Sequence, residues 1–202
     1  MIKIGLEAEM GTTDDGPLGG KKRTHEEDYF RKQDQELIDK MRRAAAVAQS
    51  RQELGEKTGL HDPSLLNDLE ALGFAPDTVS LLPLVPLIQV AWAEGGVSGA
   101  ERSQIEALAR KRGIAEGSAA DIQLSDWLSA RPREEIFAGA TRLIRAMLAA
   151  GSAETRDLTA DDLVKYCENI AAASGGVLGI GKVSAEERAA LAQIAARLKT
   201  RQ

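Results

Sequence analysis

The chain is poor in aromatic residues and in cysteine. Phe, Trp and Tyr make up 3% of its 202 residues, so a hydrophobic core has to be built from Leu, Ile, Val and Ala. Alanine and leucine favour helices, whereas the β-branched and aromatic residues that favour strands are sparse. The single cysteine, Cys167, excludes an intrachain disulfide bond and a cysteine-rich zinc site. We therefore expect an all-α protein.

The chain also lacks an excess of positive charge and a long apolar run. Its net charge is −5, so no overall basic field is present to hold nucleic acid. Its most apolar stretch, residues 81–93, is interrupted by Pro83 and Pro86 and is shorter than the roughly 20 residues of a membrane span. Residues 1–9 contain acids where a signal peptide needs apolar residues. We expect a cytoplasmic protein without a membrane span or a nucleic-acid partner.

Residues that carry catalytic chemistry are few. The two histidines, His25 and His61, have no partner at the spacing of a metal site or a catalytic triad. Cys167 is predicted to be a small core residue, because no neighbouring base is identifiable that would activate its thiol. Trp92 and Trp127 fall on apolar helix faces and are also predicted to be core residues. We therefore predict a protein that is not an enzyme and needs no cofactor.

A helix-start signal, V-S-x-x-E-R, occurs twice, at residues 97–102 and 183–188. In each copy the serine hydroxyl can accept a hydrogen bond from the third amide of the new helix, while the glutamate reaches back to the amide of the serine. This reciprocal arrangement is a capping box. Because apolar residues at helical spacing follow both copies, the repeat predicts two similar helices and at most one internal duplication.

The remaining pattern predicts a compact bundle of about seven short helices at 63–202, preceded by a separate amphipathic helix. Residues 1–22 are rich in Gly, Asp and Thr and are predicted to be a disordered tail. The amphipathic helix is predicted at 23–55, beginning at Thr24 with Glu27 as its capping acid, and the linker at 56–62. A long central helix is expected from Pro76 to Ala93, kinked by its two internal prolines.

The helix at 23–55 carries an unusual combination of charge and aromatic residues. Its apolar positions form a narrow stripe, and Tyr29 and Phe30 supply two large anchors among dense mixed charge. Such a helix buries little on its own, so it gains from docking in a partner protein's groove or from pairing with itself. The alternative is that both rings pack on the helical domain. The candidate partner-binding residues are Glu26, Glu27, Tyr29, Phe30, Arg31 and Leu37.

Two further patterns each have two interpretations. Glu94, Ser98 and Glu101 surround one tight turn, and their oxygens suit a poor calcium or magnesium site; in the other interpretation Glu101 is the capping acid and Glu94 is solvated. Residues 176–182 match the G-x-x-x-x-G-K core of a phosphate-binding loop. Val183 stands where that motif needs Ser or Thr, and a helix is expected where it needs a strand, so we interpret the segment as an inter-helix loop.

The segment A-W-A-E-G-G-V-S-G-A-E at 91–101 resembles the signature of TerB-like domains, the tellurite-resistance family, and residues 173–187 resemble it more loosely. The resemblance covers roughly 63–200. It implies an all-helical fold, no established catalytic activity and a role in stress or metal-ion response through acidic residues. Glu94 stands where the family usually has aspartate, and it is the only metal-binding position that the resemblance transfers.

The segment E-E-D-Y-F-R at 26–31, with its G-K-K-R lead-in, separately resembles the mitochondrial ATP synthase inhibitor protein over residues 20–38. That resemblance implies that Tyr29 and Phe30 anchor in a catalytic subunit interface. Three hypotheses follow: a non-enzymatic TerB-like stress-response or adaptor module that docks a protein through its first helix, a regulator of a rotary ATPase, and a nucleotide hydrolase that uses the 176–182 loop.

Overall fold

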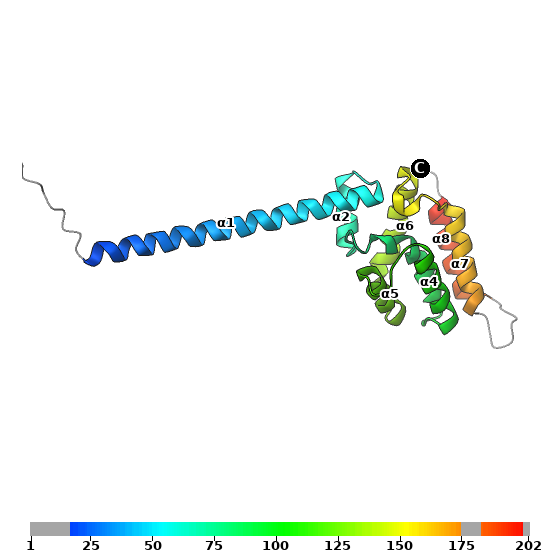
Figure 1. The fold of residues 1–202 in the computed structure, drawn as a ribbon. Coiled ribbons are helices and arrows are strands. Elements are labelled where there is room, and N and C mark those ends of the chain that lie inside the picture. Colours follow the sequence, from blue (N-terminus) through cyan, green and yellow to red (C-terminus); the bar gives the residue numbers. More distant parts are fainter. Residues whose placement is uncertain (1–16, 175–182, 200–202) are drawn as a thin grey trace, which may run out of the picture. The chain divides into compact units, whose positions relative to one another are not determined.

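The structure, a computed structural model, describes residues 17–174 and 183–199, and it describes side chains from residue 29 onward. Helices account for all the regular structure of this part of the chain, in which no strand occurs, so the predicted all-α fold is confirmed (Figure 1). The elements are α1 (Pro17–Thr58), α2 (Pro63–Ala71), the 3₁₀ helix η1 (Val79–Leu84), α3 (Val85–Ala91), α4 (Gly99–Lys111), α5 (Ala119–Ser129), α6 (Glu134–Ala150), the 3₁₀ helix η2 (Ala153–Thr155), α7 (Ala160–Ser174) and α8 (Ala185–Lys199).

The chain forms two compact units, residues 1–47 and 48–202. The boundary falls inside α1, not at the predicted linker of 56–62, because the last turns of this helix belong to the core of the second unit. There Leu54 and Thr58 are buried, and the Thr58 hydroxyl donates to the carbonyl oxygen of Leu54. The bounds therefore differ from the helix predicted at 23–55 and the domain predicted from residue 63: α1 runs to Thr58, and residues 59–62 connect it to α2.

The helix predicted at 23–55 continues through Gly55 to Thr58. A Cβ atom at Gly55 would lie 3.1 Å from the carbonyl oxygen of Leu60, so the absent side chain permits a close approach of the chain. The helix ends before Gly59, whose φ of +67° lies in the left-handed region that glycine adopts at little cost.

The start of α1 also differs from the prediction. The helix begins at Pro17 instead of Thr24, which lies inside it and is not an N-cap. Proline suits a first helical turn because its φ is already helical and its missing N–H would be unpaired there. The Lys, Arg and Glu residues that follow are good helix formers, so the helix extends through them. The disordered tail was predicted for residues 1–22; residues 17–22 instead lie in α1, and residues 1–16 lie outside the described residues.

The centre of the second unit is α3, which packs against α4, α6, α7 and α8. The single kinked helix expected from Pro76 to Ala93 is instead two elements, η1 and α3. Pro83 lies within η1 and Pro86 in the first turn of α3. Each proline removes an amide donor and clashes with the preceding turn, so together they break the α-helix. Large side chains of both elements are fully buried: Leu81, Leu82, Leu84, Leu87 and Ile88.

None of the helices within the described ranges has a stretch that is both long enough and apolar enough to cross a bilayer. The predicted absence of a membrane span agrees with this finding for those residues.

Candidate interaction surface and the paired helix caps

The first candidate site is the aromatic pair on α1. The side chains of Tyr29 and Phe30 are 60% and 64% exposed. Their ring centroids lie 6.0 Å apart with an interplanar angle of 71°, an edge-to-face arrangement that aromatic rings favour. The two rings thus contact each other edge to face while both remain open to solvent.

The exposed apolar surface continues along α1. Leu37, Ile38, Met41 and Val47 are each between 43% and 64% exposed. Among the side chains that the structure describes, the only other large hydrophobic residue with comparable exposure is Ile122 on α5. The exposed apolar side chains are thus concentrated on one helix. An isolated exposed hydrophobic residue needs no explanation, but a contiguous row is typical of an interaction surface.

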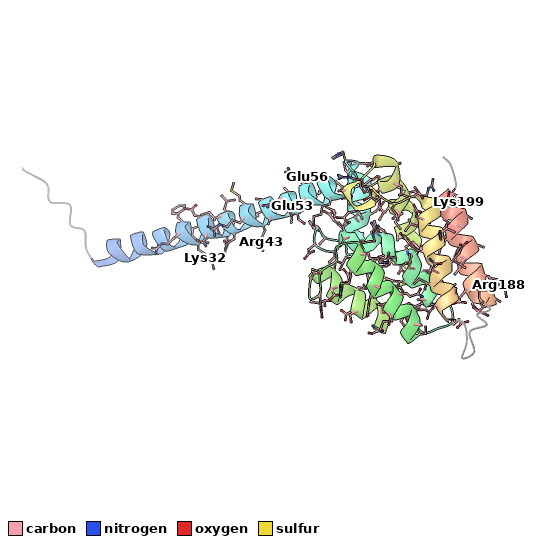
Figure 2. All side chains as sticks on the ribbon, turned by 45° about the vertical axis from the view of Figure 1, so that its right-hand side comes forward. Lys32, Arg43, Glu53, Glu56, Arg188 and Lys199 are labelled. Carbon is pink, nitrogen blue, oxygen red and sulfur yellow. The ribbon has the colours of Figure 1, made fainter. Side chains whose placement is uncertain are left out.

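Polar and charged side chains occupy the other faces of α1, including Lys32 and Arg43 (Figure 2). Asp39 accepts a hydrogen bond from Gln35 at 3.2 Å and pairs with Arg42 at 3.7 Å. Such exposed contacts within one helix stabilise it only slightly. Glu26 and Glu27 lie in the helical backbone of α1, but their side chains are outside those described.

The second candidate site is the pair of capping boxes, and both form as predicted. The Ser98 hydroxyl accepts from the amide of Glu101 at 3.3 Å, while the Glu101 carboxylate accepts from the amide of Ser98 at 2.7 Å. In the second box the corresponding distances between Ser184 and Glu187 are 3.0 and 2.8 Å. The repeated motif therefore starts α4 and α8 with the same hydrogen bonds.

The two capping glutamates are buried close to one another. Glu101 is 2% exposed and Glu187 1% exposed. Burial raises the pKa of Glu101, the hydrogen bonds from Ser98 oppose that change, and the negative charges of Glu187 and Glu94 add to the increase. This proximity was not predicted. The repeated motif predicts two similar helix starts, but the closeness of their capping acids depends on how α4 and α8 pack.

Glu94, the predicted metal ligand, is exposed beside this buried pair. Within the part of the chain that the structure describes, no group of three or more His, Cys, Asp or Glu residues is arranged to hold a metal ion. Glu101 is the capping acid, as one of the two interpretations predicted, and its Oε2 is engaged with the Ser98 amide. A metal-binding role for Glu94 stays a prediction.

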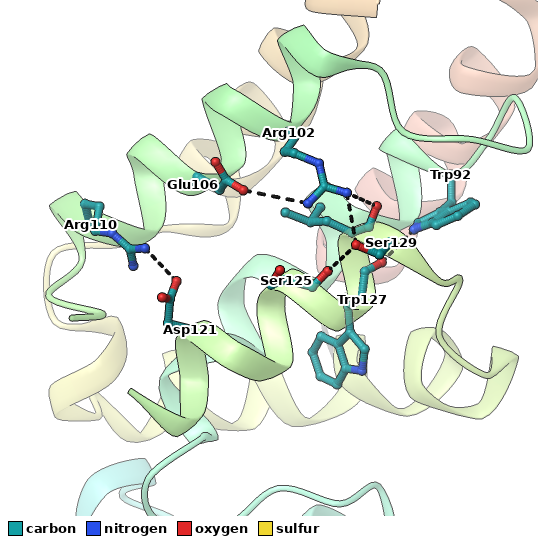
Figure 3. A network of polar contacts seen from close by, with 9 residues as sticks. Trp92, Arg102, Glu106, Arg110, Asp121, Ser125, Trp127 and Ser129 are labelled. Atoms are coloured by element: carbon teal, nitrogen blue, oxygen red, sulfur yellow. Dashed lines mark hydrogen bonds and ion pairs between the residues drawn. The ribbon is translucent and has the colours of Figure 1, made fainter. Parts of the chain in front are cut away.

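A set of polar contacts, called here the polar clasp, joins α5 to α4 and to the end of α3 (Figure 3). It uses side chains that reach backbone carbonyls at the end of α5 and one ion pair at its start. The contacts are Trp92 Nε1 to the Trp127 carbonyl at 2.8 Å, Arg102 to the Leu128 carbonyl at 2.6 Å and Arg110 to Asp121 at 2.6 Å. Because these groups satisfy one another, we interpret the clasp as structural.

Cys167 is fully buried on α7, as predicted. Burial raises the pKa of its thiol to about 12, and the charge of Glu168 contributes to the increase. A thiol in this environment stays protonated at neutral pH and is a poor nucleophile. His61 is exposed, and the side chain of His25 is outside those described.

The 176–182 segment, which resembles a phosphate-binding loop, lies outside the described residues. The element that precedes it is α7, which ends at Ser174. A phosphate-binding loop of this type follows a buried strand, so the structural context that the motif requires is missing on that side.

No family model, no curated protein and no solved structure matches this chain. The structure thus defines the chain by its fold alone, as an all-α bundle whose first helix carries an exposed amphipathic surface.

Proposed function

We propose that this protein is a non-enzymatic, TerB-like adaptor or stress-response module that docks a protein partner through the N-terminal part of α1. The supporting observation is the concentration of exposed large apolar side chains on that helix. In the α2–α8 bundle Ile122 is the one large apolar side chain of comparable exposure among those described, so we assign the bundle the role of scaffold and the N-terminal part of α1 that of docking arm.

The proposal is tested by capture of binding proteins with the full chain. We expect the triple variant Tyr29→Ala/Phe30→Ala/Leu37→Ala to lose the capture of partner proteins. These changes remove the apolar anchors of α1 and leave the buried core intact. Ile122→Ala, a change at the comparably exposed residue on α5, is the matched control and should capture the same proteins. If the triple variant captures the same proteins as the unmodified chain, the docking role is wrong.

A second candidate function is regulation of a rotary ATPase through residues 26–31. The observation that favours it is the exposed edge-to-face pair of Tyr29 and Phe30 on a continuous helix. Addition of the full chain to such an ATPase is then expected to slow ATP hydrolysis, and Tyr29→Ala/Phe30→Ala should abolish the effect. Unchanged hydrolysis at high micromolar protein would exclude this function.

A further inference from the structure

The apolar surface of α1 follows the spacing of a two-stranded coiled coil. Residues 30, 34, 37, 41, 44 and 48 alternate in steps of four and three, which places them along one seam of the helix. Phe30, Leu37 and Met41 on this seam are exposed, as are Ala44 and Ala48. Ile38 and Val47 flank the seam and widen it. Only Asp34 interrupts its apolar character.

Charge is distributed unequally along the same helix. Residues 26–39 contain six acids and two bases, for a net charge of −4. Residues 40–47 contain Lys40, Arg42 and Arg43 and no acid, for a net charge of +3. A parallel pair of these helices would set like charges against each other over its whole length, whereas an antiparallel pair sets the acidic part of each helix against the basic part of the other.

We infer that α1 pairs in an antiparallel manner with α1 of a second copy of this chain. This inference rests on the proposed role of the arm as an interaction element and names its partner.

Side-chain sizes along the seam match this direction. When Leu37 is set opposite the partner's Met41, the next layers place Asp34 opposite the partner's Ala44 and Phe30 opposite the partner's Ala48. Each large ring then meets a small residue, and alternation of large and small side chains is how helix interfaces fill space. The parallel register would instead place the two Asp34 carboxylates together in the seam, where two buried like charges are strongly unfavourable.

The first test is the mass of the full-length protein as a function of concentration, measured by sedimentation equilibrium. The average mass should rise from the 21.6 kDa of one chain towards twice that value. Leu37→Asp/Met41→Asp should weaken the dimer by about 100-fold, because it buries four charges at the centre of the pair. Both residues are exposed in one chain, so its circular dichroism at low concentration should not change. Ile122→Asp is the matched control and should dimerise normally.

The second test distinguishes the direction of pairing. If unlike charges face each other, raising the salt concentration from about 0.05 to 0.5 M should weaken the dimer by about tenfold, because the attraction is screened. Tighter association at high salt would indicate like charges in contact and would contradict the antiparallel arrangement. Spin labels on Tyr29→Cys should lie roughly 30 Å apart along the axis in an antiparallel pair. A separation near the interaxial distance of about 10 Å would contradict it.

The outcomes separate this inference from the proposed function. A chain that stays monomeric at all concentrations, or a dimer unaffected by Leu37→Asp/Met41→Asp, overturns the self-pairing. If such a monomer still captures another protein through Tyr29, Phe30 and Leu37, the docking role survives and only its assigned partner is wrong. Loss of both behaviours overturns both proposals.

Discussion

The Glu101 carboxylate stabilises the start of α4 although its burial disfavours its own ionised form. It closes the capping box of α4, yet it does so at 2% exposure and near the negative charge of Glu187. Burial raises the pKa of Glu101, so the folded protein holds this proton at higher pH than the unfolded chain does. Its contribution to stability is therefore complete below the ordinary pKa of 4.5 and decreases as the pH rises through the raised value.

Glu101→Gln should remove this pH dependence. The glutamine retains an oxygen that can accept from the Ser98 amide but does not ionise. We expect the free energy of unfolding of the variant, relative to the unmodified protein, to increase as the pH rises from about 4 to 7. Urea unfolding followed by circular dichroism measures this difference. Glu135→Gln, at an exposed acid of α6, is the control, and an equal pH dependence of the two variants would contradict the assignment.

The burial of Cys167 should protect its thiol from chemical modification. Because the thiol is fully buried and burial raises its pKa to about 12, we expect a maleimide reagent to label it only when the bundle unfolds. Labelling followed by mass spectrometry should give no detectable adduct in native buffer and complete modification in concentrated urea. Rapid labelling of the native protein would show that α7 opens readily or that the thiol is not in this core.

Helices in the bundle could be predicted well where the sequence contains paired start and stop signals. Both V-S-x-x-E-R motifs form capping boxes at the starts of α4 and α8, as predicted. The predictions failed where a local signal was overruled by its surroundings. α1 continues through Gly55, where Leu54 and Thr58 on either side are buried in the second unit, and paired prolines divide the segment before Trp92 into two elements.

The two caps should make comparable contributions to stability. Ser98→Ala and Ser184→Ala each remove one hydrogen-bond acceptor at a helix start, and each should lower the free energy of unfolding by about 1 kcal/mol. Ser50→Ala, at an exposed position inside α1, should change it by less than about 0.5 kcal/mol. Chemical denaturation of the three variants provides the comparison. A negligible effect at both caps would mean that tertiary packing alone holds α4 and α8.

Some features of this fold can be predicted from local sequence patterns, whereas others depend on how distant segments pack together. The exposed stripe of α1 could be predicted from its spacing, because exposure and periodicity are local properties of an amphipathic helix. Neither the closeness of Glu101 to Glu187 nor the burial of Leu54 follows from spacing, since each depends on how distant helices pack. The unit boundary inside α1 was missed for the same reason.

The boundary between the two units lies inside α1, so residues on either side of it should differ in their contribution to the stability of the bundle. Leu54→Ala removes a fully buried side chain and should lower the free energy of unfolding by about 2–5 kcal/mol. Leu37→Ala, in the same helix but 56% exposed, should leave the stability of the bundle within about 0.5 kcal/mol. Thermal unfolding of the two variants tests this contrast. Equal effects would mean that residues 48–58 are not part of the second unit.

The scarcity of tryptophan has a practical consequence for spectroscopy. The chain has two tryptophans, Trp92 and Trp127, and the indole of one donates to the backbone carbonyl of the other. Both lie in the second unit, so fluorescence excited at the red edge of the absorption band reports on the bundle alone, while the arm emits nothing. Far-ultraviolet ellipticity sees the arm as well. A difference between the thermal unfolding curves followed by tryptophan fluorescence and by far-ultraviolet ellipticity therefore reports the unfolding of the arm, without any added dye.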